Sequence, residues 1–221
     1  MSCTVTYLKH SGFAVRTGAR QLLFDYIGDH FVRDPDVPLI ALASHVHGDH
    51  YDPAIARLAD TCLLGEGIEP FEGAISMAPG ETIELDGMTV RAFGSTDCGV
   101  SFLVHADGLN IFHAGDLNFW HWRWESTPDE VREALQAFNA VLDDLEDLPV
   151  DLAFFPVDDR MGAGHDEGAD MYIRRIAPKV LIPMHWWGKP AVAEDFARKH
   201  REGPTRVLAL TTPGEHIDLF H

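Results

Sequence analysis

Three histidines and an aspartate are crowded into one short stretch of this chain. His45, His47, Asp49 and His50 lie within six residues of one another. Imidazole nitrogens and carboxylate oxygens are ligands that zinc and similar divalent ions bind, and a catalytic metal site keeps one coordination position open for water. The stretch therefore predicts most of a metal site, because such a density of ligand-type side chains is unusual for an ordinary surface loop.

The flanking sequence predicts rigid elements on both sides of this stretch. The apolar run 38–43 indicates a buried strand, so the histidines should follow its carboxyl end, where α/β proteins carry their sites. Asp52 and Pro53 then indicate the beginning of a helix, since aspartate suits the cap position and proline the first turn. The ligand loop is expected between these two elements.

This arrangement resembles the HxHxDH motif of the metallo-β-lactamase superfamily, and the resemblance runs along nearly the whole chain. It implies one domain, residues 1–221, with an α/β fold that is a four-layer αββα sandwich. Later apolar runs that end in aspartate and in histidine resemble the strands that carry the remaining ligands. Asp25 resembles the aspartate that supports the site by hydrogen bonding to a ligand. The implied metal ligands are His45, His47, Asp49, His50, Asp116 and His185.

One motif departs from the family pattern. The superfamily normally has another histidine after the strand expected at 88–94, and the segment there reads Ser95-Thr96-Asp97-Cys98. His105 lies further on, within the next expected strand, and is a poor substitute. Asp97 could replace the missing ligand with oxygen and Cys98 with a thiolate, or only the second metal position could be filled. We favour a weakened or differently selective first position, and a free cysteine such as Cys98 is more often a small buried residue.

The segment 7–13 resembles the GHxSF-type opening of the branch related to L-ascorbate 6-phosphate lactonase and N-acylphosphatidylethanolamine phospholipase D. The histidine of that opening lies near the metals in this branch. The resemblance implies that His10 contacts the substrate or carries a proton, and a purely structural role is the alternative.

Tryptophans follow both of the late ligand candidates. Trp120 and Trp122 come shortly after the expected aspartate ligand, and Trp186 and Trp187 directly follow the expected final histidine. Indole rings offer a large apolar contact area and one hydrogen-bond donor, which suits a sugar ring, an aryl group or an acyl chain. They are candidate substrate-binding residues, and packing of loops against the sheet is the alternative.

Two adjacent carboxylates follow the strand expected at 152–155. Asp158 and Asp159 are candidates for orienting His185 or contacting the substrate, and a turn or capping role is the alternative. Asp159 therefore joins Asp25 and Asp97 as a supporting or replacement side chain.

The remaining sequence is typical of an α/β protein with two sheets. Strand-like runs are expected at 5–8, 21–25, 39–43, 89–93, 101–104, 109–113, 152–155, 180–183 and 207–210, and helices at about 127–145, 168–176 and 191–201.

Charge and cysteine content restrict the partners. The formal net charge of −18 disfavours a nucleic-acid partner, because such proteins show a basic face. No apolar run approaches the roughly 20 residues that span a bilayer, so no membrane partner is expected. The three cysteines form no CxxC pair and the amino terminus has no leader-like segment, which predicts a cytoplasmic protein. The sequence does not indicate an oligomeric state.

These features together predict a metal-dependent hydrolase with one or two zinc ions, with manganese or iron as alternatives. Coordination lowers the pKa of water from 15.7 to about 7, so a bound water becomes the nucleophile. Asp49 would hold or deprotonate this water, with His10 as a second catalytic candidate. A small ester, lactone or phosphoester is the expected substrate. The alternative function is a non-hydrolytic metal-binding or sensor protein with a degenerate first metal position.

Overall fold

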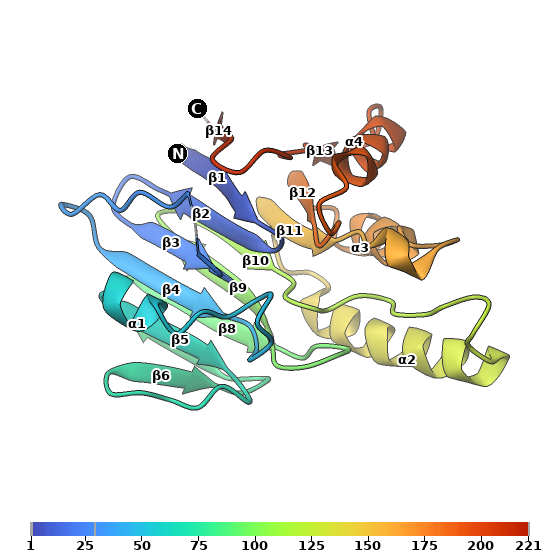
Figure 1. Ribbon diagram of the computed structural model, residues 1–221, viewed down its shortest axis with the longest axis horizontal. Helices are drawn as coiled ribbons and strands as arrows, with labels where there is room; N and C mark the ends of the chain where they lie inside the picture. Colours follow the sequence, from blue (N-terminus) through green and yellow to red (C-terminus); the bar gives the residue numbers. More distant parts are fainter. Residues whose placement is uncertain (1, 29, 221) are drawn as a thin grey trace.

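The computed structural model of the protein describes residues 2–28 and 30–220. Two seven-stranded sheets pack face to face in an α/β sandwich, as the sequence predicts (Figure 1). Across the first sheet the order is β14 (His216–Leu219), β1 (Cys3–Lys9), β2 (Gly12–Arg16), β3 (Gln21–Phe24), β4 (Leu39–Ala43), β5 (Thr61–Gly65) and β6 (Ala74–Met77). Across the second sheet it is β13 (Arg206–Val207), β12 (Val180–Met184), β11 (Leu152–Pro156), β10 (Leu109–His113), β9 (Ser101–Ala106), β8 (Met88–Phe93) and β7 (Thr82–Leu85).

The helices cover the two sheets unequally. Helices α2 (Pro128–Leu145), α3 (Glu167–Ile176) and α4 (Pro190–Lys199) lie on the side of the second sheet (Figure 1). Beside β4 and β5, the described part of the chain has one helix, α1 (Ile55–Leu58), a single turn of four residues. The helix expected to begin at Asp52 and Pro53 begins at Ile55, and Asp52 Oδ1 accepts a hydrogen bond from Ala54 N (2.8 Å) in the turn before it.

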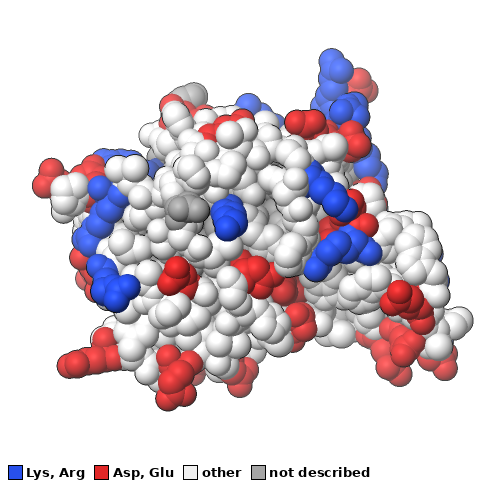
Figure 2. Space-filling model, in the orientation of Figure 1, with Lys and Arg blue, Asp and Glu red and all other residues white. Residues whose placement is uncertain are grey.

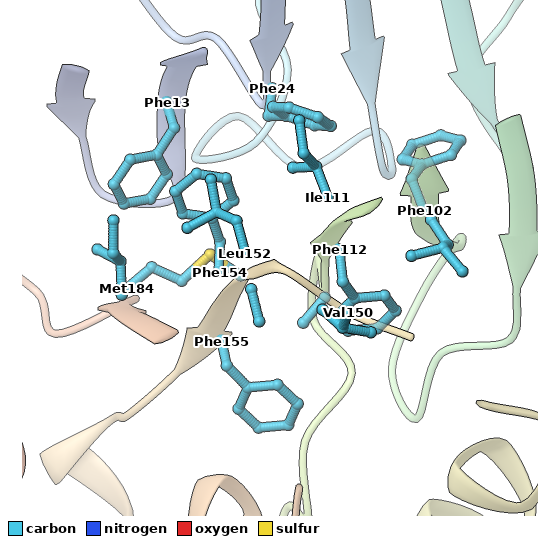
Figure 3. Close-up of a cluster of buried hydrophobic side chains, with 14 of the residues drawn as sticks. Phe13, Phe24, Phe102, Ile111, Phe112, Val150, Leu152, Phe154, Phe155 and Met184 are labelled. Atoms are coloured by element: carbon cyan, nitrogen blue, oxygen red, sulfur yellow. The ribbon is translucent and has the colours of Figure 1, made fainter. Parts of the chain in front are cut away.

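The main core lies between the two sheets, where aromatic side chains from facing strands meet (Figure 3). Phe13 of β2 stacks on Phe154 of β11 with ring centroids 4.2 Å apart, and Phe24 of β3 approaches the same ring. Each such fully buried ring contributes roughly 1.5–3 kcal/mol of stability. A smaller apolar cluster, which includes Leu23 and Ile55, lies between the first sheet and α1. The two clusters give the ligand loop after β4 a rigid base.

All nine expected strands are present, but several short strands were not predicted. The strand expected at 207–210 is only Arg206–Val207, and β2, β5, β6, β7 and β14 were not predicted. Each of these five has only four or five residues, which is too short for a distinctive hydrophobic pattern. Among residues 2–28 and 30–220, no helix is long and apolar enough to cross a membrane.

Helix α2 begins with a capping box. The Thr127 hydroxyl accepts a hydrogen bond from Glu130 N (3.3 Å), and the Glu130 carboxylate accepts one from Thr127 N (2.7 Å). The acidic last turn of α2 is held by Arg175 of α3, which contacts Asp143 (2.6 Å) and Glu146 (2.9 Å). Both ends of this long helix are therefore fixed by polar contacts.

The capping box predicts the effect of a substitution on stability. Thr127→Ala should lower the free energy of unfolding by about 1 kcal/mol, because the amide of Glu130 loses the hydroxyl that caps it. Thr127→Ser, which keeps the hydroxyl, is the matched control. Urea unfolding followed by circular dichroism measures both, and equal stability of the alanine variant and the wild type would contradict the assignment.

Candidate metal centre

The candidate ligands gather because several strands end at the same edge of the sandwich. β4 lies between the parallel neighbours β3 and β5, and β10, β11 and β12 also run parallel. The loops after β4, β10 and β12 carry His45 to His50, Asp116 and His185. Parallel strand order thus brings together residues that are up to 140 positions apart in the chain.

Asp116 lies at the middle of a buried group of imidazoles. Its Oδ1 lies 3.0 Å from His50 Nε2 and 3.3 Å from His185 Nε2, and its Oδ2 lies 3.4 Å from His45 Nε2. The two oxygens therefore face different histidines. This is the placement that a carboxylate needs in order to bridge two ions or to anchor one.

Several of these buried atoms lack a hydrogen bond. Among the described residues, Nε2 of His10, His50 and His185 and Oδ1 of Asp116 are buried with no hydrogen-bond partner. Each unsatisfied buried polar atom costs about 1–3 kcal/mol. Imidazole nitrogen and carboxylate oxygen are the donor set of a zinc-like ion, so the group fits a divalent metal. The ligand atoms of His10, Asp49, His50 and His185 lie within 4.8 Å of one another, as do those of His45, His50 and Asp116.

Two buried carboxylates orient the imidazoles of His50 and His185 by accepting hydrogen bonds from their Nδ1 atoms. Asp25 accepts hydrogen bonds from Ser44 N, Ser44 Oγ and His50 Nδ1, all at 2.7 Å. Asp158 accepts one from His185 Nδ1 at 3.0 Å. Each contact turns the Nε2 atom of its histidine toward the centre, which is how supporting carboxylates act at metal sites.

Asp158, rather than Asp159, contacts His185. The Asp159 carboxylate instead pairs with Lys189 Nζ at 2.8 Å, near the surface. The chain enters a short 3-10 helix, Asp159–Met161, directly after β11, and Asp158 caps it by accepting from Arg160 N (3.0 Å). Asp158, and not the predicted Asp159, is therefore the carboxylate that supports His185.

Burial and ion pairs shift the pKa values of the cluster in opposite directions. Burial lowers the pKa of His50, but its contacts with Asp116 and Asp25 raise it overall to about 10. Burial raises the pKa of Asp116, yet His185 and His50 bring it well below the usual range. Burial lowers the pKa of His45. In the metal-free protein at neutral pH, His50 therefore carries a proton that a bound ion would displace.

His10 and Asp49 form a pair at the edge of the cluster. His10 Nε2 lies 3.4 Å from Asp49 Oδ2. This contact lowers the pKa of Asp49 despite its burial, and burial lowers the pKa of His10. His10 and His185 both have a positive φ, 55° and 65°. Such strained backbone is often found at functional sites.

A third group of ligand-type side chains lies toward the surface. His47, Asp97 and Cys98 offer ligand atoms within 4.8 Å of one another. Cys98 is partly exposed and not the buried core residue that was the commoner expectation. His105 lies on β9, is exposed, and bonds Asn110 Oδ1 (2.8 Å), so it does not reach the centre.

The four candidate tryptophans border two cavities beside the cluster. Trp186 and Trp187, with His10 and Asp49, line a cavity of about 560 Å³. Trp120 and Trp122 line another of about 340 Å³, together with Asp116, His185 and Arg160. Trp187 also carries the Arg160 guanidinium 4.0 Å above its ring. Arg160 was not predicted as a residue of the site, because one arginine in a loop has no distinctive pattern.

Glycines allow neighbouring loops to pack directly on the ligand loop. A Cβ at Gly65 would lie 2.0 Å from Ser44 O, and one at Gly99 would lie 2.1 Å from the same atom. A Cβ at Gly115 would lie 2.7 Å from Ser44 Cβ. The first residue of the ligand loop is thus enclosed by three glycines from three separate segments.

Comparisons with known proteins agree with this geometry. The family described as beta-lactamase superfamily domain matches residues 4–121. The protein therefore belongs to the metallo-β-lactamase superfamily, as the resemblance implied.

Its curated relatives span the same length. The UPF0173 metal-dependent hydrolases of Symbiobacterium thermophilum and Pyrococcus abyssi are 29% and 27% identical to it, over 97% of this chain and 99% of each relative. Among solved structures, Igni18, a metallo hydrolase from Ignicoccus hospitalis, has a TM-score of 0.71 at 17% identity and covers 100% of both chains. The metallo-β-lactamase fold protein YhfI from Bacillus subtilis has a TM-score of 0.65 at 14% identity, over 98% of this chain and 99% of that one. These likenesses show the fold.

Gly99 provides a test of the packing against the ligand loop. Gly99→Ala should weaken metal binding, because its Cβ would meet Ser44 O and His45 Cβ (2.6 Å). Gly87→Ala is the control, since Gly87 has a similar positive φ and no atom within 4 Å of the added Cβ. Competition with a chromogenic chelator measures both affinities. Equal affinities in the two variants would contradict the packing argument.

The two adjacent aspartates provide a second test. Asp158→Asn should reduce metal affinity by about 10–100-fold, the usual effect of losing a carboxylate that orients a histidine ligand. Asp159→Asn should leave it unchanged, because Asp159 contacts Lys189 and not His185. Calorimetric zinc titration of both variants gives the comparison, and a reversed order would refute the assigned roles.

Proposed function

We propose that the protein is a metal-dependent hydrolase that uses an activated water molecule on a small ester, lactone or phosphoester. The observation that carries this proposal is the convergence of the buried Nε2 atoms of His50 and His185, which have no hydrogen bond, on the carboxylate of Asp116 beside two cavities. The names of the curated relatives, metal-dependent hydrolases, support the same activity.

The buried ion would be held by His50, Asp116 and His185, with Asp49 at the cavity side and with His45 Nε2 facing His47 Nδ1 (3.0 Å). Zinc suits this nitrogen and oxygen donor set, with manganese or iron as alternatives. When bound, such an ion polarises the scissile bond and lowers the pKa of water from 15.7 to about 7. These side chains offer enough ligand atoms for one ion or for two.

Asp49 is the proposed base. Its carboxylate is ionised at neutral pH, because its pKa is lowered by the contact with His10. It lines the larger cavity, so it can accept a proton from a water molecule that enters there. His10 lines the same cavity beside Asp49 and is kept neutral by burial, which leaves it able to hold Asp49 in place or to pass the proton on.

The cavities support a substrate with an apolar part and a negative or strongly polar part. Trp186, Trp187 and Tyr7 line the larger cavity, and Tyr7 packs 5.4 Å from Trp186. Arg160 is the one lysine or arginine among the residues that line the smaller cavity. Its guanidinium pairs with the buried Asp158 through Nε (2.9 Å) and Nη2, and the remaining nitrogen, Nη1, would favour a phosphoester or a carboxylate-bearing ester or lactone. The resemblance of residues 7–13 to the lactonase branch supports the same choice.

The partner and location hypotheses stay predictions. The face in Figure 2 shows lysines and arginines scattered among aspartates and glutamates, without a basic patch, which supports a small-molecule substrate over nucleic acid. The cytoplasmic location and the absence of a membrane partner continue to rest on the sequence features described above.

A non-hydrolytic metal sensor is the second candidate function. It is favoured by one observation, the Ser95–Cys98 segment where the family normally has a histidine. A sensor would bind metal tightly and turn over none of the candidate substrates.

Turnover on a substrate panel separates the two functions. The zinc-loaded wild type should hydrolyse at least one member of a panel of p-nitrophenyl esters, lactones and phosphodiesters. Asp116→Asn should abolish this turnover, because the carboxylate at the middle of the cluster is lost. Asp151→Asn is the control, since Asp151 is a buried carboxylate at the amino end of β11 that accepts from Asn110 N (2.8 Å). Metal binding without turnover in the wild type would support the sensor.

A further inference from the structure

The loop that lacks the family histidine packs closely against the ligand loop. Residues 94–100 join β8 to β9, and Val100 N donates a hydrogen bond to Ser44 O (3.1 Å). Gly99 lies so close that an added Cβ would meet His45 Cβ at 2.6 Å. These two contacts place Cys98 and Asp97 beside His47.

The three side chains have spacing suitable for a shared ion. Cys98 Sγ lies 4.0 Å from His47 Nε2 and 3.8 Å from Asp97 Oδ1. With zinc–sulfur bonds of about 2.3 Å and zinc–nitrogen bonds of about 2.0–2.1 Å, tetrahedral ligand atoms lie roughly 3.6 Å apart. Small side-chain rotations would therefore bring all three ligand atoms to one ion.

A chain of hydrogen bonds fixes which nitrogen of His47 faces this group. Ser44 Oγ donates to Asp25 (2.7 Å), so it must accept from His45 Nδ1 (2.9 Å). A neutral His45 then has its lone pair on Nε2, where it accepts from His47 Nδ1 (3.0 Å). His47 is left with a lone pair on Nε2, the atom that faces Cys98. Through these hydrogen bonds, the buried Asp25 determines that Nε2 of the exposed His47 is the nitrogen free to bind a metal.

We propose that His47 Nε2, the Cys98 thiolate and the Asp97 carboxylate form a zinc-selective metal position at the mouth of the site, outside the buried position at His50, Asp116 and His185. Its donor set includes one soft thiolate, which favours zinc over manganese or magnesium. The proposal deepens the proposed hydrolase by giving it a second, chemically different ion. It also gives the Ser95–Cys98 segment a function in place of the missing histidine.

Cobalt substitution tests this position directly. Protein loaded with Co²⁺ should show the near-ultraviolet absorption of thiolate-to-cobalt charge transfer. Cys98→Ser and His47→Ala should lose this band, and zinc per chain should fall from two to one in each. Cys3→Ala is the cysteine control, because Cys3 is buried on β1 and should not contribute to the band. A wild type without the band, or a Cys98→Ser variant that keeps two zinc ions, would overturn the proposal.

A second measurement needs no substitution near the site. Zinc should protect Cys98 of the wild type from alkylation by iodoacetamide, and peptide mass analysis measures the rate of this alkylation. Equal alkylation rates with and without zinc would overturn the proposal.

The variant Asp116→Asn separates the proposed zinc position from the proposed hydrolase activity. That variant should lose the buried ion and all turnover while it keeps the cobalt–thiolate band. If Cys98→Ser loses the cobalt–thiolate band but even the wild type has no turnover, the hydrolase proposal is refuted. The proposed zinc position would still stand in that case.

Discussion

The buried carboxylate of Asp25 is the interaction on which the site depends. It is fully buried, and a charge in such a place is very costly unless it is paired and hydrogen bonded. Asp25 meets this requirement with three contacts at 2.7 Å, two to Ser44 and one to His50. Those contacts fix both ends of the ligand loop. They also set the tautomer of His45 and, through it, that of His47.

The rest of the scaffold holds the opposite ends of the same network. β10 and β12 bring Asp116 and His185 to the ligand loop, and Asp158 fixes His185 as Asp25 fixes His50. The result is a set of inward-facing atoms that form ion pairs with one another but, among the described residues, lack a hydrogen bond. Burying polar atoms without hydrogen bonds is unfavourable, so the arrangement is expected where a ligand binds. Stability and metal binding are therefore coupled in this protein.

The sequence predicted most of the fold, and it identified most of the ligand-type side chains that lie together, because both depend on short-range patterns. Apolar runs marked the buried strands, and ligand-type residues stood directly after them. Where tertiary contacts decide the outcome, prediction failed. Asp158 and Asp159 are equivalent by position, and only the direction of the chain after β11 separates them. The close approach of Gly99 to Ser44 joins segments that no local pattern connects. The edge strands β6, β7 and β14 have only four residues each, so the sequence offers too few positions to recognise them.

The buried imidazoles and Asp116 are proposed to bind a divalent ion, and calorimetric titration of zinc into metal-free protein at pH 7 tests this proposal most directly. The heat should be measured in two buffers of different ionisation enthalpy. His50 has a pKa of about 10 and is protonated at pH 7, whereas a histidine must be neutral to bind zinc. We expect tight binding of at least one ion per chain with net release of at least one proton, and an affinity that rises with pH. Absence of binding, or binding with no proton released, would contradict it.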